Sequence, residues 1–274
     1  MNLSTTSLIK SACVVGLSFG LFACGGDKTE TSQPSAKSEV AQGQAPMNDE
    51  IVVAITQDFA PFTYLDEKGG VVGFDVDIIN AIAQKKGLKI HYKSTTFDDI
   101  FTAVENKTAN VGASGIYDKE ERRSKYGLTK PYHTDTPVYF YRADNEKLSK
   151  ANLSSVADLN SQVLDIAVVG SVDGLSSNHT IHAVKSEFVG FTGVLQGKYD
   201  VAFSDASVLS HAIKSNPDSA KIELKSVKYQ GDVGYVMLVN KENTELLQKL
   251  NEGIDELIQS GEMTQIKQKY GLNH

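Results

Sequence analysis

The sequence predicts an α/β fold that contains two similar units, one after the other. Two observations predict it: short β-branched runs alternate with segments of helical periodicity, and this alternation occurs twice along the chain. About 225 residues follow the first 50, which is enough for one large domain or two lobes that each have a core. We expect the two units to join near residues 132–136.

The first unit is expected to alternate three strands with two helices. Residues 51–55, Ile-Val-Val-Ala-Ile, form a short apolar run that is typical of a buried strand. Asp75 is predicted to cap a helix that ends at Gly87, because Asp favours helix N-caps and Gly favours the residue after a helix. The elements that follow are a strand at 89–92, a helix at 97–105 and a strand at 110–114.

The second unit repeats this alternation and ends in amphipathic helices. Strands are predicted at 164–169, 187–189, 200–203 and 236–239, and helices at 172–183, 191–196, 206–215 and 244–259, with a last short helix after Gly261. In open α/β sheets, ligands bind beyond the carboxyl ends of the strands. The turns after residues 55, 114, 169 and 203 are therefore the places where a site is expected.

Composition excludes several classes of function. The formal net charge of the 274 residues is −7, and Lys and Arg form no basic block, so nucleic acid is not an expected partner. Both cysteines, Cys13 and Cys24, precede the predicted fold, which can therefore hold neither disulfides nor thiolate metal sites. We expect no cofactor and no metal. His179 and His182 are interpreted as a surface pair on one helix face, because no third ligand is near them in the sequence.

The N-terminal segment has the pattern of a secretion signal. Residues 1–23 are expected to be a signal peptide, because Lys10 precedes an apolar stretch that is too short to span a membrane. The stretch ends in Leu-Phe-Ala-Cys-Gly-Gly, which is similar to a bacterial lipobox with Cys24 as the lipidated residue; the alternative is a plain secretory signal with an incidental Cys. Residues 24–49 lack aromatic side chains and are expected to form a flexible tether that spans roughly 25–30 Å.

Three stretches at the predicted strand ends carry a resemblance to a known family. They are Gln57 to Tyr64 (QDFAPFTY), Gly73 to Asp77 (GFDVD), and Ser114 to Tyr117 (SGIY) with Glu121-Arg122 and Pro131-Tyr132 downstream. This pattern resembles the bacterial extracellular solute-binding proteins of family 3, the substrate-binding proteins of ABC importers for polar amino acids. The resemblance covers about residues 50–272.

The resemblance implies a two-lobe fold of the periplasmic-binding-protein type (type II), with the ligand in the cleft between the lobes. Lobe 1 is expected to comprise residues 51–131 plus 236–274, and lobe 2 residues 137–230. The hinges are expected near residues 132–136 and 231–235.

Two charged residues are the main candidates for ligand binding. In the family, an Arg at the place of Arg122 holds the α-carboxylate of the ligand, since a planar guanidinium binds a carboxylate through two parallel hydrogen bonds. The family's acid at the place of Asp205 receives the α-ammonium; the alternative for Asp205 is a helix cap. From the charged run around it alone, Arg122 would be a solvated surface residue.

Further candidates supply backbone donors. Ser114 and the Gly115 N–H are expected to help bind the carboxylate from lobe 1. Gly170 and Ser171 are expected to present N–H groups at a helix start in lobe 2, where the helix dipole favours anions. The alternative for Gly170 and Ser171 is a simple turn.

The remaining candidates shape the cleft. Phe59 and Phe97 are expected to be its aromatic walls, although core packing is the more common role of Phe. Tyr117 departs from the family, in which a short hydroxyl or acidic residue is common, and is expected to narrow the pocket or to add a stacking face. Thr56 supplies no charge for a basic ligand, and Asp58 is expected to point elsewhere.

These observations predict a substrate-binding lipoprotein of an ABC importer that captures a small amino acid by lobe closure and performs no catalysis. Its expected partners are the amino acid, the ABC transporter permease and, through the lipid anchor, a membrane; we expect a monomer outside the cytoplasm. One alternative is a surface lipoprotein that senses a ligand. The other is a dehydratase-type enzyme on the same scaffold, which would need Glu187 or His133 in the cleft.

Overall fold

The structure is a computed structural model that describes residues 50–229 and 231–272. The predicted signal peptide, the lipidated Cys24 and the tether lie outside the described residues. Within the two described ranges, none of the helices combines the length and the apolar character that crossing a membrane requires.

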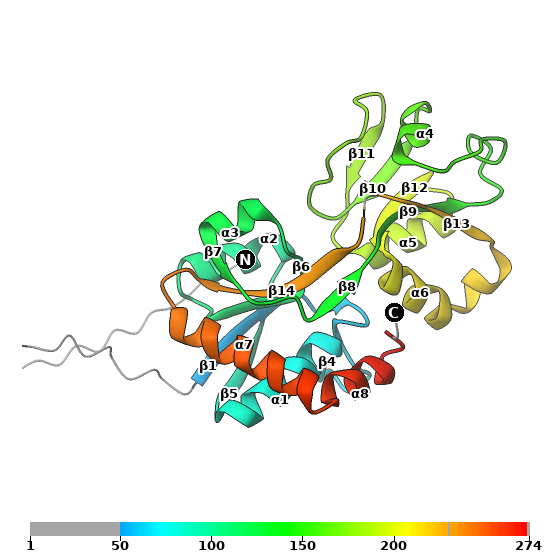
Figure 1. Cartoon of the computed structure of the whole chain (residues 1–274). Helices are drawn as coiled ribbons and strands as arrows, with labels where there is room; N and C mark the ends of the chain where they lie inside the picture. Colours follow the sequence, from blue (N-terminus) through cyan, green and yellow to red (C-terminus); the bar gives the residue numbers. More distant parts are fainter. Residues whose placement is uncertain (1–49, 230, 273–274) are drawn as a thin grey trace, which may run out of the picture. The chain divides into compact units, whose positions relative to one another are not determined.

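The first sheet has six strands. Their order is β5 (Lys89–Ser94), β1 (Glu50–Ile55), β6 (Val111–Tyr117), β14 (Val233–Asn240) and β7 (Tyr126–Leu128), with β8 (His133–Asp135) also paired to β14. β1 is parallel to both β5 and β6, whereas β14 is antiparallel to its three neighbours. Figure 1 shows β14, which comes late in the sequence, among strands from the first part of the chain.

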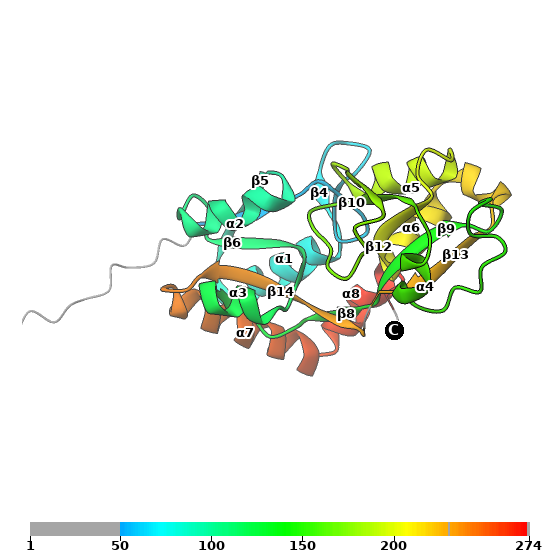
Figure 2. The same ribbon diagram turned by 90° about the horizontal axis from the view of Figure 1, so that it is seen from above.

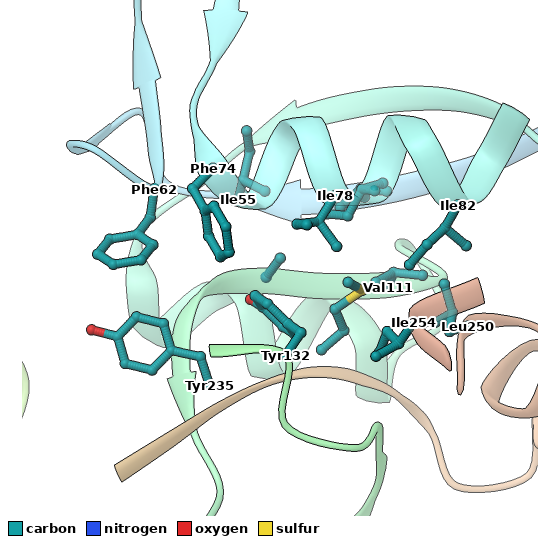
Figure 3. Packing of buried hydrophobic residues seen from close by; sticks show 14 of the residues in the cluster. Ile55, Phe62, Phe74, Ile78, Ile82, Val111, Tyr132, Tyr235, Leu250 and Ile254 are labelled. Carbon is teal, nitrogen blue, oxygen red and sulfur yellow. The ribbon is translucent and has the colours of Figure 1, made fainter. Parts of the chain in front are cut away.

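Helices cover both faces of the first sheet, because alternate residues of each strand point to opposite sides. Ile51, Val53 and Ile55 of β1 belong to one core cluster, whereas Ala54 belongs to another. The helices of the first sheet are α1 (Phe74–Lys86), α7 (Thr244–Gln259) and α8 (Glu262–Lys269) on one face, and α2 (Phe97–Glu105) on the other. Figure 3 shows how the isoleucines of α1 meet Leu250 and Ile254 of α7.

The second sheet has five strands in the order β11 (Thr180–Ala183), β10 (Asp165–Val168), β12 (Val201–Asp205), β9 (Pro137–Arg142) and β13 (Leu224–Lys228). β10 is parallel to β11 and β12, and β9 is antiparallel to β12 and β13. The helical elements of this part are α4 (Val156–Asn160), α5 (Glu187–Leu195), α6 (Ala206–Ser215) and the 3₁₀ turn Pro217–Lys221. Both sheets thus combine a parallel trio with antiparallel strands, and the predicted α/β class is confirmed.

The chain passes between the two sheets twice. β8 of the first sheet leads into β9 of the second, and β13 of the second leads back into β14 of the first. Near these passages β8 and β14 pair with each other, and Thr136 Oγ1 donates to Asp232 Oδ1 at 2.6 Å. Figure 2 shows β8 and β14 together from above. The small elements β2 (Asp58–Phe59), β3 (Thr63–Leu65) and β4 (Val71–Val72) form a third sheet, and α3 (Glu120–Lys125) follows β6.

Two predicted elements of the second unit are wrong. Residues 172–183 form no helix; they form a turn-rich segment that ends in β11. β11 forms because the main chain of Thr180–Ala183 pairs with β10, and such tertiary pairing overrides local periodicity. The predicted strand at 187–189 is the first turn of α5, whose start is fixed by the Ser186 side chain, which accepts from the Val189 N–H.

Asp75 and the two histidines also differ from expectation. The N-cap of α1 is Gly73, at φ 136°, where a Cβ atom would lie 2.0 Å from the Phe62 carbonyl oxygen. Asp75 lies inside the first turn and its carboxylate is free for other partners. His179 and His182 share no helix face; they bond separately, to Asn160 at 3.0 Å and to Asp165 at 2.9 Å.

Candidate functional site

One cavity of about 190 Å³ is lined by elements of both sheets. A space of this size is sufficient for a small organic molecule. Every ligand-binding residue predicted from the sequence lines it. These residues are Thr56, Phe59, Phe97, Ser114, Gly115, Tyr117, Arg122, Gly170, Ser171 and Asp205.

Ser114 lies in the middle of β6 (Val111–Tyr117) and lines the cavity. Its Oγ accepts from the Thr56 N–H at 3.0 Å and lies 2.8 Å from the Thr63 hydroxyl. Its own N–H donates to Asp75 Oδ2 at 3.1 Å. Ser114 has φ 109°, a backbone conformation that L-residues adopt only when their surroundings enforce it. The three bonds supply that enforcement, so the strained turn is a built part of the site.

Gly115 has a different role from the one predicted. Its N–H donates to Asp75 Oδ2 at 3.1 Å, so the donor expected for a ligand carboxylate is already used, and the same holds for the Ser114 N–H. A Cβ atom at Gly115 would lie 2.4 Å from the Phe59 ring, and φ is +58°. Gly115 is therefore required because it lets the Phe59 ring lie against the main chain.

Asp75 is the residue that the sequence analysis placed in the wrong role. Its side chain is 0% exposed, and burial raises its pKa, against the lowering effect of the Gly115 and Ser114 N–H groups and Tyr132. A carboxylate that accepts two main-chain N–H groups fixes the main-chain conformation of the two donor residues. Asp75 thus joins α1 to Ser114 and Gly115 of β6, both of which line the cavity.

Arg122 reaches the cavity from α3. Its Nη1 donates to the Tyr117 carbonyl oxygen at 2.8 Å, and its guanidinium carbon lies 5.0 Å from the centroid of the Phe101 ring. Burial lowers the pKa of the guanidinium, and Glu121 opposes this, although an Arg keeps its charge in proteins. The Nε and Nη2 atoms of Arg122 make no hydrogen bond to any of the described residues. They are the donors available for an anionic group, whereas Arg123 pairs with Asp118 at the surface.

Asp205 lies at the end of β12 and occupies the N-cap position of α6, yet its side chain makes no capping hydrogen bond. Its Oδ1 accepts from the Tyr117 hydroxyl, and its Oδ2 accepts from the Tyr235 hydroxyl at 2.5 Å. Burial, followed by the charge of Asp135, raises the pKa of Asp205 to about 7, while the two hydroxyls lower it. The alternative role as a helix cap is therefore excluded by the direction of the side chain.

Glu187 is a cavity residue that the predicted site did not include. It is the first residue of α5, and its Oε2 accepts from the Ser204 hydroxyl. Burial, followed by the charge of Asp205, raises the pKa of Glu187 well above its usual value. His133, the other residue that the enzyme alternative needed, does not line the cavity. It is 3% exposed and packs against the rings of Phe62, Phe74 and Tyr235.

Gly170 and Ser171 line the cavity, but no helix begins there. Gly170 has φ +66° in a turn after β10. A helix dipole therefore does not act at this turn, and the ligand role of Gly170 and Ser171 stays a prediction. Any contribution to anion binding has to come from the local N–H groups alone.

Aromatic rings form much of the remaining wall. Phe59 stacks on Phe62 with ring centroids 5.3 Å apart, and Phe97 meets Phe101 edge-on at 5.5 Å. Phe101 lines the cavity as well and packs against the core cluster behind it. Asp58, which was expected to point elsewhere, is also among the residues that line the cavity. Its pKa is raised by burial and lowered by hydrogen bonds that include Ser186.

Metal binding finds no support in the described part of the chain. Within residues 50–229 and 231–272, no group of three or more His, Cys, Asp or Glu side chains is arranged to hold an ion. The charged groups that line the cavity include the guanidinium of Arg122 on α3 and the carboxylate of Asp205 at the end of β12.

Comparisons with known proteins identify the family of the chain. Residues 51–273 match the family described as "Bacterial extracellular solute-binding proteins, family 3". A "Probable histidine-binding protein" of Neisseria gonorrhoeae is 26% identical over 267 residues, which covers 95% of this chain and 94% of that protein. The "L-cystine-binding protein TcyA" of Bacillus subtilis is 24% identical over 254 residues, with 91% of each chain covered.

Solved structures show the same fold. The chain is similar to "An ancestral arginine-binding protein bound to arginine", with a TM-score of 0.73 and 26% identity over 82% of this chain and 99% of that one. The predicted two-sheet fold of the periplasmic-binding-protein type is therefore confirmed.

Proposed function

The chain belongs to the bacterial extracellular solute-binding proteins of family 3, and on that premise we propose that it captures a small polar amino acid and delivers it to an ABC importer. The observation that carries the proposal is that Arg122, on the helix α3 between two strands of the first sheet, and Asp205, at the end of β12 in the second sheet, line the same cavity. A zwitterion carries the two complementary charges on neighbouring groups. The chain is a binding component outside the cytoplasm, as its family is, and the ligand leaves it unchanged.

Arg122 binds the α-carboxylate in this proposal. Two donors of its guanidinium are available, and its approach is fixed by the Tyr117 carbonyl and the Phe101 ring. Asp205, in its ionised form, receives the α-ammonium. At ~4 Å and an effective dielectric constant near 20, each such ion pair contributes roughly 4 kcal/mol before desolvation is subtracted. This is comparable with the few kcal/mol that separate open from closed forms of two-domain proteins.

Lobe closure accompanies binding. Lobe 1 comprises residues 51–131 and 236–274, lobe 2 comprises residues 137–230, and the hinges are residues 132–136 and 231–235. The pairing of β8 with β14 supports these hinge positions, because both connections run together between the sheets. Each ligand charge finds its partner only when the lobes approach each other.

The side chain of the ligand meets a cavity with an excess of acidic residues. The acids that line it are Asp58, Asp98, Glu121, Asp173, Glu187 and Asp205, and the bases are Lys119, Arg122 and Lys185. Aromatic walls at Phe59 and Phe97 also favour a cationic group through their ring faces. We therefore propose a polar side chain that is neutral or positively charged; the similar proteins named above include ones named for histidine, cystine and arginine binding.

Membrane attachment is proposed from the sequence. Cys24 follows a lipobox-like segment and would carry the lipid, and residues 24–49 would tether the binding domain to the membrane that holds the permease. Globomycin treatment, which blocks processing of lipoproteins, would leave the chain uncleaved. Palmitate labelling of the wild type that disappears in a Cys24→Ala variant supports the anchor, and a wild-type chain that takes up no label contradicts it.

A thermal-shift screen of the purified protein against the amino acids tests the proposed function. A true ligand at a hundred times its dissociation constant stabilises the protein by about 2.7 kcal/mol. Chromatography of the sample afterwards should return the ligand unchanged. Failure of every amino acid to shift the transition would contradict the proposal, and conversion of a ligand would favour an enzyme in which Glu187 is the acid.

A further inference from the structure

Tyr117 connects the two sheets through a direct side-chain hydrogen bond. It ends β6 in the first sheet, and its hydroxyl donates to Oδ1 of Asp205 at the end of β12 in the second sheet. Tyr235 of β14 lies opposite Tyr117 in the strand register and donates to Oδ2 of the same carboxylate. The two rings stack with centroids 5.9 Å apart, and Figure 3 shows Tyr235 at the end of the first sheet's core, next to Phe62. One acid is thus held by two hydroxyls.

These hydrogen bonds reduce the number of donors that Asp205 requires from a ligand. A carboxylate offers about four acceptor positions, and a tyrosine oxygen can itself accept a hydrogen bond. An ammonium group can therefore donate to Asp205 and to the Tyr117 oxygen together. A ligand without an amine still leaves both carboxylate oxygens satisfied, which matters because Asp205 is only 1% exposed. A buried acceptor without a donor is costly, and the tyrosines prevent that situation.

We propose that Tyr117 is a specificity-determining residue of this cleft: by supplying its own hydroxyl to Asp205, it lets the site accept carboxylic acids that lack an α-amine, and it holds the two lobes together before a ligand arrives. The first half rests on the proposed function, whereas the second concerns the ligand-free protein. The residue acts on the ligand through Asp205 and not through a charge of its own.

The test is Tyr117→Phe, which removes the hydroxyl and keeps the ring. The matched control is Tyr92→Phe, because the Tyr92 hydroxyl also makes two hydrogen bonds in the first unit, to Asn80 and the Val76 carbonyl, and does not line the cavity. Calorimetry would compare L-arginine with 5-guanidinopentanoate, L-histidine with imidazolepropionate, and L-glutamine with glutaramate. In each pair the second acid lacks only the α-amine.

The readout is the dissociation constant of the acid without the α-amine divided by that of the matching amino acid. We expect this ratio to rise roughly tenfold or more in Tyr117→Phe relative to the wild type, because Asp205 then depends on the ligand amine for one of its donors. Tyr92→Phe should leave the ratio unchanged. An unchanged or smaller ratio in Tyr117→Phe overturns the specificity role.

Small-angle X-ray scattering of the ligand-free proteins separates this proposal from the proposed function. Tyr117→Phe should increase the radius of gyration relative to wild type and Tyr92→Phe, because one of the two hydroxyl contacts that join the sheets at Asp205 is lost. Equal radii for all three overturn the holding role. If no probe binds the wild-type protein, the proposed function fails, while a larger radius for Tyr117→Phe alone would still support the contact.

Discussion

The guanidinium of Arg122 lies 5.0 Å above the Phe101 ring, and this relationship gives the site's cation a fixed direction. Phe101 is part of α2, whereas Arg122 is part of α3, so two helices position one charge. The Tyr117 carbonyl holds Nη1 from the other side at 2.8 Å. A pre-oriented cation loses less freedom when a ligand binds, which is the physical basis of high affinity for small anions.

Replacement of Arg122 by Ala should weaken binding of the amino acid by about 2–5 kcal/mol, because the buried carboxylate of the ligand loses its partner. Titration calorimetry measures this loss directly. Arg123→Ala is the control, since Arg123 pairs with Asp118 at the surface and should change affinity by less than about 0.5 kcal/mol. Equal effects of the two substitutions would remove Arg122 from the site.

Replacement of Asp75 by Ala should reduce the free energy of unfolding by about 2–4 kcal/mol, because two buried N–H groups lose their acceptor. Urea unfolding gives this value. Asp77→Ala, on the same helix, removes a carboxylate that bonds Lys269 and Tyr270 on the outside, and should cost about 1 kcal/mol or less. A mild effect at Asp75 would contradict its role as the acceptor of these N–H groups.

Replacement of Gly115 by Ala combines an unfavourable φ with a collision against the Phe59 ring. Gly261, at φ +76° with no atom within 4 Å of an added Cβ, isolates the first effect. We expect Gly261→Ala to cost about 1–2 kcal/mol of stability and Gly115→Ala about 1–3 kcal/mol more. The Gly115 variant should also lose ligand affinity, since Phe59 has to move; similar values in both variants would argue against the close contact.

Affinity for the amino acid should depend on pH through Asp205, whose pKa in the ligand-free protein is about 7. The ammonium requires the ionised acid, so affinity should rise about tenfold per pH unit from pH 5 towards 7 and level off above. Calorimetry with L-arginine suits this test, because the charge of arginine is constant over that range. A flat profile in the wild type would contradict an acid–ammonium contact.

Stability of the ligand-free protein should follow the opposite trend. The folded protein keeps a proton on Asp205 that the unfolded chain releases near pH 3.8, so the free energy of unfolding should fall as pH rises from about 4 to 7. The groups that face Asp205 are Glu187, Asp135, Tyr117 and Tyr235. Asp205→Asn should make ligand affinity nearly independent of pH and should weaken the dependence of the unfolding free energy on pH. Glu187→Gln measures how much of that second dependence comes from Glu187.

The predicted carboxyl ends of the strands located much of the candidate site from the sequence. Ser114 in β6 of the first sheet and Asp205 at the end of β12 of the second belong to apolar runs that could be recognised as strands, and ligands of open α/β sheets bind beyond the carboxyl ends of strands. The family pattern then supplied Arg122, whose own neighbours in the sequence indicate only a solvated surface. Local pattern and resemblance were therefore both needed to assemble the ten residues that line the cavity.

The errors arose where contacts distant in the sequence decide the outcome. Asp75 is of a residue type that often caps helices, yet its hydrogen-bond partners, Ser114 and Gly115, are 39 and 40 residues away in the sequence. Residues 180–183 become a strand only because β10 is there to pair with them. Tyr235 lies in an apolar strand, and nothing near it in the sequence indicates that its hydroxyl meets an acid 30 residues earlier. Such contacts carry no periodic signal.

A crystal structure of the protein with its amino acid bound would test the central claim most directly. The account predicts the α-carboxylate in a two-point contact with the Arg122 guanidinium and the α-ammonium within hydrogen-bond distance of Asp205. A ligand seated elsewhere, or one that meets neither of these side chains, would contradict it.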